Sequence, residues 1–179
     1  FTVDVTSNLI SGNLGDGLSI KGPGLGTHVG DNYIGTDATG MQDLENQGAA
    51  IAVTGIRAEI EHNLIADHGA AAITAENAAP LMIRRNAIRG AGILIVQSDY
   101  ALIEQNQLSH SQSGGIRLRQ VNADIVDTTV TASQDCGVTV EASVLRMTGT
   151  TVSYNRYGGV CVVSGEATIV NSTISSNHA

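Results

Sequence analysis

Hydrophobic and polar positions recur along the chain in one pattern: an apolar residue, two mostly polar residues, Asn or a small hydroxyl residue, any residue, and a second apolar residue. In the copy at positions 60–65 these key positions are Ile60, Asn63 and Ile65. The first apolar residues of the eight copies are Val5, Val29, Ile60, Ile83, Ile103, Ile125, Met147 and Ile169. Successive copies lie 24, 31, 23, 20, 22, 22 and 22 residues apart. A fixed period near 22, in units too small to bury their own apolar face, predicts a solenoid.

A second pattern, in which a small residue is followed by apolar, variable and apolar positions, occurs in seven of the copies. The copies begin at Gly17, Ala50, Ala72, Gly92, Gly115, Gly137 and Gly159. Alternation with period 2 predicts a short strand with one buried face. The two apolar positions around the Asn predict two more strands, and no helix of ordinary length fits between these landmarks. Each coil is therefore predicted to hold three short parallel strands.

The polar position between the first two strands is a candidate corner. It is occupied by Asn8, Asn32, Asn63, Asn86, Asn106, Thr128, Thr150 and Ser172. Asn tolerates the left-handed backbone conformation, and its amide can bond the Asn of the coils above and below. We therefore expect an Asn ladder over five coils, with hydroxyl side chains and a somewhat altered bend in the last three.

This combination of an Asn ladder, three strands per coil and aliphatic stacks resembles the right-handed parallel β-helix of the pectin-lyase-like superfamily. Positions 32–40, with 46–48 and Ile51, further resemble a recurring segment of bacterial right-handed β-helix repeat proteins, many of them exported or surface proteins. The resemblance implies an all-β, right-handed parallel β-helix of about eight coils over residues 1–179. It also implies an extracellular or cell-surface location in a bacterium.

The two ends of the sequence stop inside a coil, without the polar caps that solenoids need. We therefore expect a segment of a longer solenoid or larger protein, whose end coils are covered by further coils, caps or another chain.

The amino-acid composition and net charge limit the classes of partner that the chain can bind. The sequence has no Trp, one Phe and four Tyr, so Ile, Val, Leu and Ala must fill the core. A net charge of −8 argues against nucleic acid, because no basic surface is available to displace counterions from phosphates. The apolar runs are too short for membrane insertion. A polysaccharide is the partner that the family resemblance implies.

Loop lengths predict where a groove lies. In the resembled family, the strand led by the small residue lines the substrate groove. Ile34 and Ile51 are 17 positions apart, whereas Ile88 and Ile93 are only 5 apart. We expect residues 36–47 to project beside a dip at the short coil, and such a step is one way to form a groove.

A charged cluster on and near this strand comprises Arg117, Arg119, Glu141, His110 and Asp135. Arginines there could bind the carboxylates of an acidic polysaccharide. Arg or His could remove the proton next to a uronate carboxylate, with an electrostatic partner for the enolate. The alternative, which the sequence favours, is that Arg119 and Glu141 form an ion pair between successive coils.

Four further side chains are candidates for substrate binding. Lys21 and Glu76 take outward positions on the groove strand, and Tyr154 and Tyr157 flank one loop where they could contact a sugar. Tyrosines that pack over a turn are the commoner arrangement.

The long loop offers a candidate metal site, and the two cysteines offer a candidate disulfide. Asp37, Asp43 and Glu45 in the long loop offer hard oxygen ligands for Ca²⁺, but their spacing matches no known calcium loop and favours solvated carboxylates. No other cofactor is expected. Cys136 and Cys161 are 25 residues apart and occupy different places in their repeats, so we expect no disulfide between them.

Catalytic signatures of the superfamily are missing. The sequence has no paired-Asp triad with Gly-His-Gly, no Asp-Pro-His and no Arg-x-Pro-x-x-Arg segment. The favoured interpretation is a non-catalytic repeat module of an exported or surface protein, serving as a rigid scaffold and a carbohydrate-contacting surface. The alternative is a polysaccharide lyase or epimerase acting on a uronate polymer, and the sequence leaves open which of the two it is.

Overall fold

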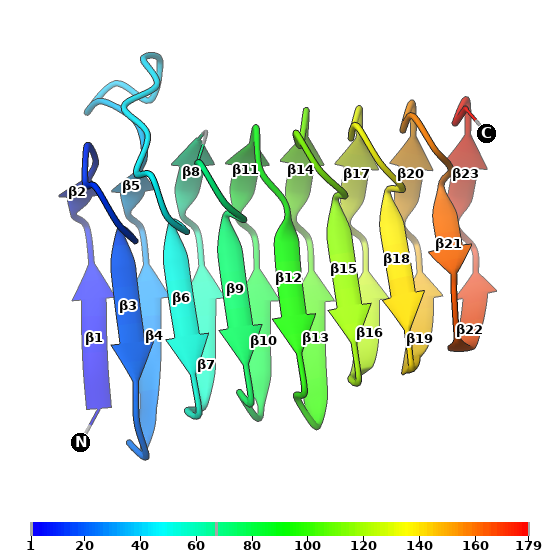
Figure 1. Cartoon of the computed structure of the whole chain (residues 1–179), viewed down its shortest axis with the longest axis horizontal. Coiled ribbons are helices and arrows are strands. Elements are labelled where there is room, and N and C mark those ends of the chain that lie inside the picture. Colours follow the sequence, from blue (N-terminus) through cyan, green and yellow to red (C-terminus); the bar gives the residue numbers. More distant parts are fainter. Residues whose placement is uncertain (1, 67, 179) are drawn as a thin grey trace.

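The computed structural model describes residues 2–66 and 68–178, and all regular structure within them is β-strand. Figure 1 shows the coils stacked side by side along the long axis, with the two chain ends at opposite ends of the stack. Seven of the eight coils give one strand to each of three parallel sheets, and the last coil, as far as the structure describes it, gives strands to two of them. This arrangement confirms the predicted architecture.

The first sheet contains the strands that precede the Asn corner. They are β1 (Thr2–Thr6), β4 (Gly26–Gly30), β7 (Ala58–Glu61), β10 (Leu81–Arg84), β13 (Tyr100–Glu104), β16 (Asn122–Val126), β19 (Ser143–Thr148) and β22 (Gly165–Val170).

The second sheet contains the short strands that follow this corner. They are β2 (Leu9–Ile10), β5 (Tyr33–Ile34), β8 (Leu64–Ala66), β11 (Ala87–Arg89), β14 (Gln107–Ser109), β17 (Thr129–Thr131), β20 (Thr151–Ser153) and β23 (Thr173–Ser175).

The third sheet contains the strands led by a small residue. They are β3 (Leu18–Lys21), β6 (Ile51–Thr54), β9 (Ile73–Glu76), β12 (Ile93–Val96), β15 (Ile116–Arg119), β18 (Val138–Glu141) and β21 (Val160–Val162).

The core consists of aliphatic stacks that follow the coil axis. Ile60, Ile83, Ile103 and Ile125 pair in register along the first sheet, and all four are fully buried. Burying such a side chain stabilises the fold by roughly 1.5–3 kcal/mol. Because each coil repeats the same contacts, one repeat of the sequence corresponds to one coil of the stack.

The first corner carries the predicted Asn ladder. The backbone amide and Nδ2 of Asn63 each donate to Oδ1 of Asn86 at 3.0 Å, and Nδ2 of Asn86 donates to the carbonyl of Ile60 at 2.9 Å. The same scheme joins Asn86 to Asn106. These side chains are almost fully buried. The ladder therefore satisfies backbone groups that the turn removes from the sheets.

The bend itself lies one residue earlier than predicted. The left-handed residues are His62, Arg85 and Gln105, with φ values of 55°, 53° and 54°. Each side chain at the bend is more exposed than the Asn that follows it, so bending and amide bonding fall on adjacent positions. The altered bend expected beside the hydroxyl residues is not found either, because Asp127 and Gly149 have φ values of 46° and 62°.

A second polar ladder, which was not predicted, follows the second sheet. The amides of Asn13 and Asn155 donate to Oδ1 of Asn46 and Asn177, both at 3.0 Å, and the amide of Ser133 donates to Oδ1 of Asn155 at 2.9 Å. Apart from Asn46 after the long loop, the members stand three residues after the inward residue of the second strand, as in the first ladder. The column is Asn13, Asn46, His68, Ala91, Ser111, Ser133, Asn155 and Asn177.

The small residues that lead the third strands are needed because neighbouring coils meet closely there. A Cβ on Gly115 would lie 2.6 Å from the carbonyl oxygen of Gly137 and 3.1 Å from Oγ of Ser133, and it would also meet Val130. Real Cβ atoms do not approach so closely. The second ladder and the stacked coils thus explain the Gly at this position.

We expect Gly115→Ala to lower the free energy of unfolding by about 2–3 kcal/mol, because the added methyl overpacks the junction of three coils. Gly15→Ala is the matched control, since its Cβ would meet nothing within 4 Å. Urea denaturation followed by circular dichroism measures both. Equal midpoints for the two variants would show that the coils are not packed as described.

Candidate functional site

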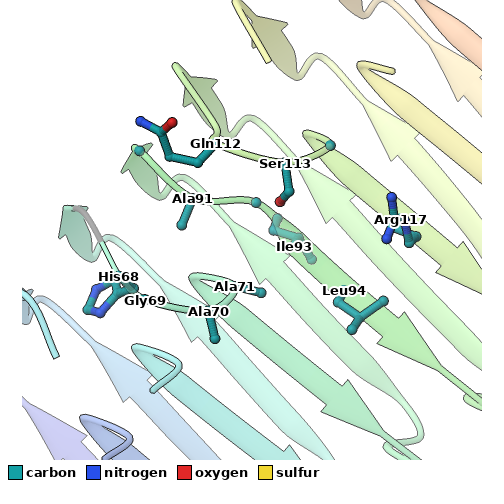
Figure 2. Close-up of a pocket in the computed structure, with 13 residues that line it drawn as sticks. His68, Gly69, Ala70, Ala71, Ala91, Ile93, Leu94, Gln112, Ser113 and Arg117 are labelled. Atoms are coloured by element: carbon teal, nitrogen blue, oxygen red, sulfur yellow. The ribbon is translucent and has the colours of Figure 1, made fainter. Parts of the chain in front are cut away.

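A groove of about 390 Å³ lies over the coil with the shortest loop. Its lining comes from three successive coils and includes His68, Ala70, Ala91, Leu94, Ser113 and Arg117. In Figure 2, Leu94 and Arg117 project from neighbouring strands of the third sheet, while Ser113 and Gln112 come from the loop before β15. The dip predicted from the loop lengths is therefore present.

The long loop beside this dip projects beyond the other turns (Figure 1), and it is held by contacts within the loop and by one contact with a strand. Thr36 and Asp43 form an antiparallel bridge across its base. The guanidinium of Arg89 pairs with the Asp43 carboxylate and so fastens the loop to the edge of β11. The projection is thus an ordered feature, built from short-range turns.

The predicted calcium ligands have other partners. Asp37 accepts from Oγ1 of Thr39 at 2.8 Å and from the amide of Met41 at 3.0 Å, and the Thr39 hydroxyl is the main cause that holds the pKa of Asp37 below its ordinary value. Asp43 pairs with Arg89. Among the residues that the structure describes, no three His, Cys, Asp or Glu side chains gather as metal ligands, so Glu45 does not complete a site with these two.

The candidate catalytic residues are only partly brought together. Arg119 Nε lies 2.7 Å from Oε2 of Glu141, as the ion-pair alternative predicts, and Arg117 bonds Oδ2 of Asp135 at 3.1 Å. Arg117 lines the groove, whereas Arg119, Glu141 and His110 do not. His110 occupies a left-handed corner after β14, with φ of 56°. The charges on the third sheet are therefore used mainly to pair successive coils.

The candidate substrate-binding residues lie apart from one another. Lys21 and Glu76 share an outward column of the third sheet, with Thr54 between them. Tyr154 and Tyr157 belong to the turn after β20, and both side chains are more than half exposed. None of the four lines the groove.

The two cysteines form a disulfide, so the prediction of unpaired thiols is wrong. Their Cα atoms lie 6.2 Å apart, within the range that a disulfide needs. Cys161 is in β21 and pairs in register with Thr139, and Cys136 lies in the loop just before β18. The prediction compared positions within the repeat, but loop residues do not follow the strand register and can reach across the spacing of one coil.

His68 is a groove residue that the sequence did not single out. Only 8% of the residue is exposed, and both ring nitrogens are buried without a well-formed hydrogen bond to any residue that the structure describes. The ring packs so closely on Gly35 that a Cβ there would lie 2.6 Å from Cε1. Burial lowers the pKa of His68 below its ordinary value of 6.5. The sequence could have singled out His68 by its position three residues after Ile65, which is the position of the second ladder.

This burial predicts a pH dependence. Below pH 6.5 the unfolded chain takes up a proton at position 68 before the folded chain does, so folding stability falls until the pH reaches the lowered pKa of His68. His68→Asn, which places the common ladder residue there, should remove this loss. Urea midpoints measured at neutral pH and at about pH 5 test the prediction.

His28 provides a control of opposite sign. A hydrogen bond with Asp4 raises the pKa of His28, so its contribution is full below pH 6.5 and is lost as the pH rises through the raised pKa. His28→Gln should therefore change folding stability on the other side of pH 6.5, where the pH rises through the raised pKa of His28. A wild-type and His68→Asn pair with parallel profiles would refute the role of His68.

Comparisons with known proteins identify a family for this chain. A family described as "Right handed beta helix region" matches residues 2–174. A search of the curated proteins and a search of the solved structures found no match.

The described residues contain no helix of the length and hydrophobicity that crossing a membrane requires.

Proposed function

The chain belongs to the family of right-handed β-helix regions, and from that premise we propose that it is a non-catalytic scaffold module of an exported or cell-surface bacterial protein. In this role the stacked coils hold other parts of the protein, or a bound polysaccharide, along a rigid rod. The fold alone does not select this role, because the same architecture can carry enzymes as well as inert stalks.

The observation that carries the proposal is the pairing of the charged side chains on the third sheet. Arg119 forms an ion pair with Glu141, and Arg117 forms another with Asp135. A general base must instead be free to accept a proton from substrate. Each of these ion pairs joins two successive coils, so the charged side chains stabilise the stack of coils.

Export is supported by the disulfide. Bonds such as Cys136–Cys161 form and persist outside the reducing cytosol, and the described chain has no free cysteine. Mass spectrometry of the alkylated, unreduced protein from its own cells should find both thiols oxidised. Alkylation of both cysteines would argue against export.

One observation favours the second candidate, a uronate lyase or epimerase. Arg117 lines the groove, and its buried Nε has no hydrogen-bond partner among the residues that the structure describes. Nε itself is out of reach of a ligand, but the Arg117 side chain is 34% exposed, so its guanidinium could pair with a substrate carboxylate in the groove. The residue is therefore the one that an enzyme acting here would use.

Turnover assays separate the two candidates. Incubation with alginate, pectate and glycosaminoglycans, followed by ultraviolet absorbance of unsaturated products, should show no change, and proton NMR of the polymers should show no epimerisation. Product formation that disappears in Arg117→Ala but persists in Arg156→Ala would replace the scaffold proposal with the enzyme. Arg156 is a suitable control because it is exposed and lies outside the groove.

A further inference from the structure

A second hollow, on the first sheet, lies on a different face from the groove. It has a volume of about 440 Å³, in the range of small-ligand sites. We define the Tyr100 patch as the lining side chains Asp99, Tyr100, Asn122, Asp124, Val144 and Arg146. Tyr100 pairs in register with Asn122 and then Val144, and Asp124 pairs with Arg146, so three successive coils build the patch.

The Tyr100 ring is held in place before any ligand arrives. Its hydroxyl donates to Oδ2 of Asp124 at 2.8 Å, and 39% of the residue is exposed. Burial and the Asp124 carboxylate raise the pKa of Tyr100, so the hydroxyl keeps its proton. A partly exposed aromatic ring that is already fixed loses little conformational freedom on binding.

Three of the polar side chains around the ring have no protein partner among the described residues. Within the part of the chain that the structure describes, the side chains of Asn122, Asp99 and Arg146 make no hydrogen bond or ion pair with other protein groups. An amide, a carboxylate and a guanidinium are flat groups that can each bond two neighbouring hydroxyls. Val144, which is 38% exposed, adds apolar surface beside them.

We propose that the Tyr100 patch binds a neutral oligosaccharide, with one pyranose ring against the face of Tyr100 and its hydroxyls bonded by Asn122, Asp124 and Arg146. Aromatic side chains with a polar edge in contact with solvent suit such amphipathic ligands. Two carboxylates against one guanidinium, in a chain of net charge −8, disfavour a uronate polymer.

The site is longer than one sugar ring. An adjoining hollow shares Asp99, Asn122 and Val144 and extends to Ser98 and Gln120. Together the two follow the corner between the third and first sheets, where a chain of sugars can continue. This inference deepens the proposed function, because it gives the carbohydrate-contacting surface a place and a ligand class.

NMR titration of the full chain with maltotetraose, cellotetraose and mannotetraose, and with tetragalacturonate in parallel, tests the inference. At least one neutral probe, at millimolar concentration, should shift the amides of residues 99–102, 122–124 and 144–146. Tyr100→Ala should weaken that binding about tenfold. Tyr100→Phe, which keeps the ring and loses its tether, should have a smaller effect. Tyr33→Ala, at a similarly exposed tyrosine outside the patch, should have none.

The inference is overturned if no neutral probe shifts these amides, if only tetragalacturonate does, or if the shifts centre on Tyr157. Such a failure would leave the scaffold proposal intact, because that proposal depends on the turnover assays and on cysteine oxidation. An unchanged spectrum of Tyr100→Ala away from the patch shows that loss of binding is not loss of fold.

Discussion

Asn86→Leu is expected to lower the free energy of unfolding by about 4 kcal/mol. The substitution removes the oxygen that accepts from the backbone amide and Nδ2 of Asn63, and the nitrogen that donates to Ile60. These partners are buried, so water cannot replace the lost bonds. Each buried polar group left without a partner costs about 1–3 kcal/mol. Urea denaturation of the two proteins gives the difference.

Gln107→Leu is the matched control for this prediction. Gln107 is also an amide residue, in β14 of the next coil, but its side chain is exposed. The same change of chemistry there should alter the free energy of unfolding by less than about 0.5 kcal/mol. Equal losses in both variants would show that the effect of Leu is general and that the ladder contributes little.

Replacing both cysteines by serine is expected to lower the free energy of unfolding by about 3 kcal/mol. The disulfide joins residues 25 positions apart, and a cross-link of this length removes much conformational entropy from the unfolded chain. Thermal and urea denaturation of Cys136→Ser/Cys161→Ser against the oxidised wild type measure the loss.

Reduction provides the control for the serine variant. Wild-type protein denatured in dithiothreitol should match the variant, because both lack the cross-link and keep similar side chains. If the reduced wild type instead retains its full stability, the disulfide does not constrain the unfolded chain.

The coils could be predicted from the sequence because each structural rule repeats about eight times. One Asn is a weak signal, but Asn8, Asn32, Asn63, Asn86 and Asn106 at one place in the period indicate a corner. The second ladder follows the same spacing and was missed, because Ala91 interrupts it and the long loop displaces Asn46. The residues of the second ladder differ in type, so their regular spacing along the backbone was not recognised in the sequence.

The sites were harder to predict, because they depend on distances between coils. The spacing of the repeat placed Arg119 opposite Glu141 correctly, since both lie within strands. It failed for Cys136, which lies in a loop. The burial of His68 and the tether between Tyr100 and Asp124 depend on neighbouring coils through side-chain packing, which a one-dimensional pattern does not contain.

Hydrogen exchange of the native protein tests most directly whether the stack is a rigid scaffold. The backbone amides of Asn32, Asn63 and Asn86 donate to the next ladder side chain, and those of Ser133 and Asn155 do the same in the second ladder. The predicted result is slow exchange at all five, with opening free energies close to that of global unfolding. Exchange at the rate of an unstructured peptide at these corners would contradict the account.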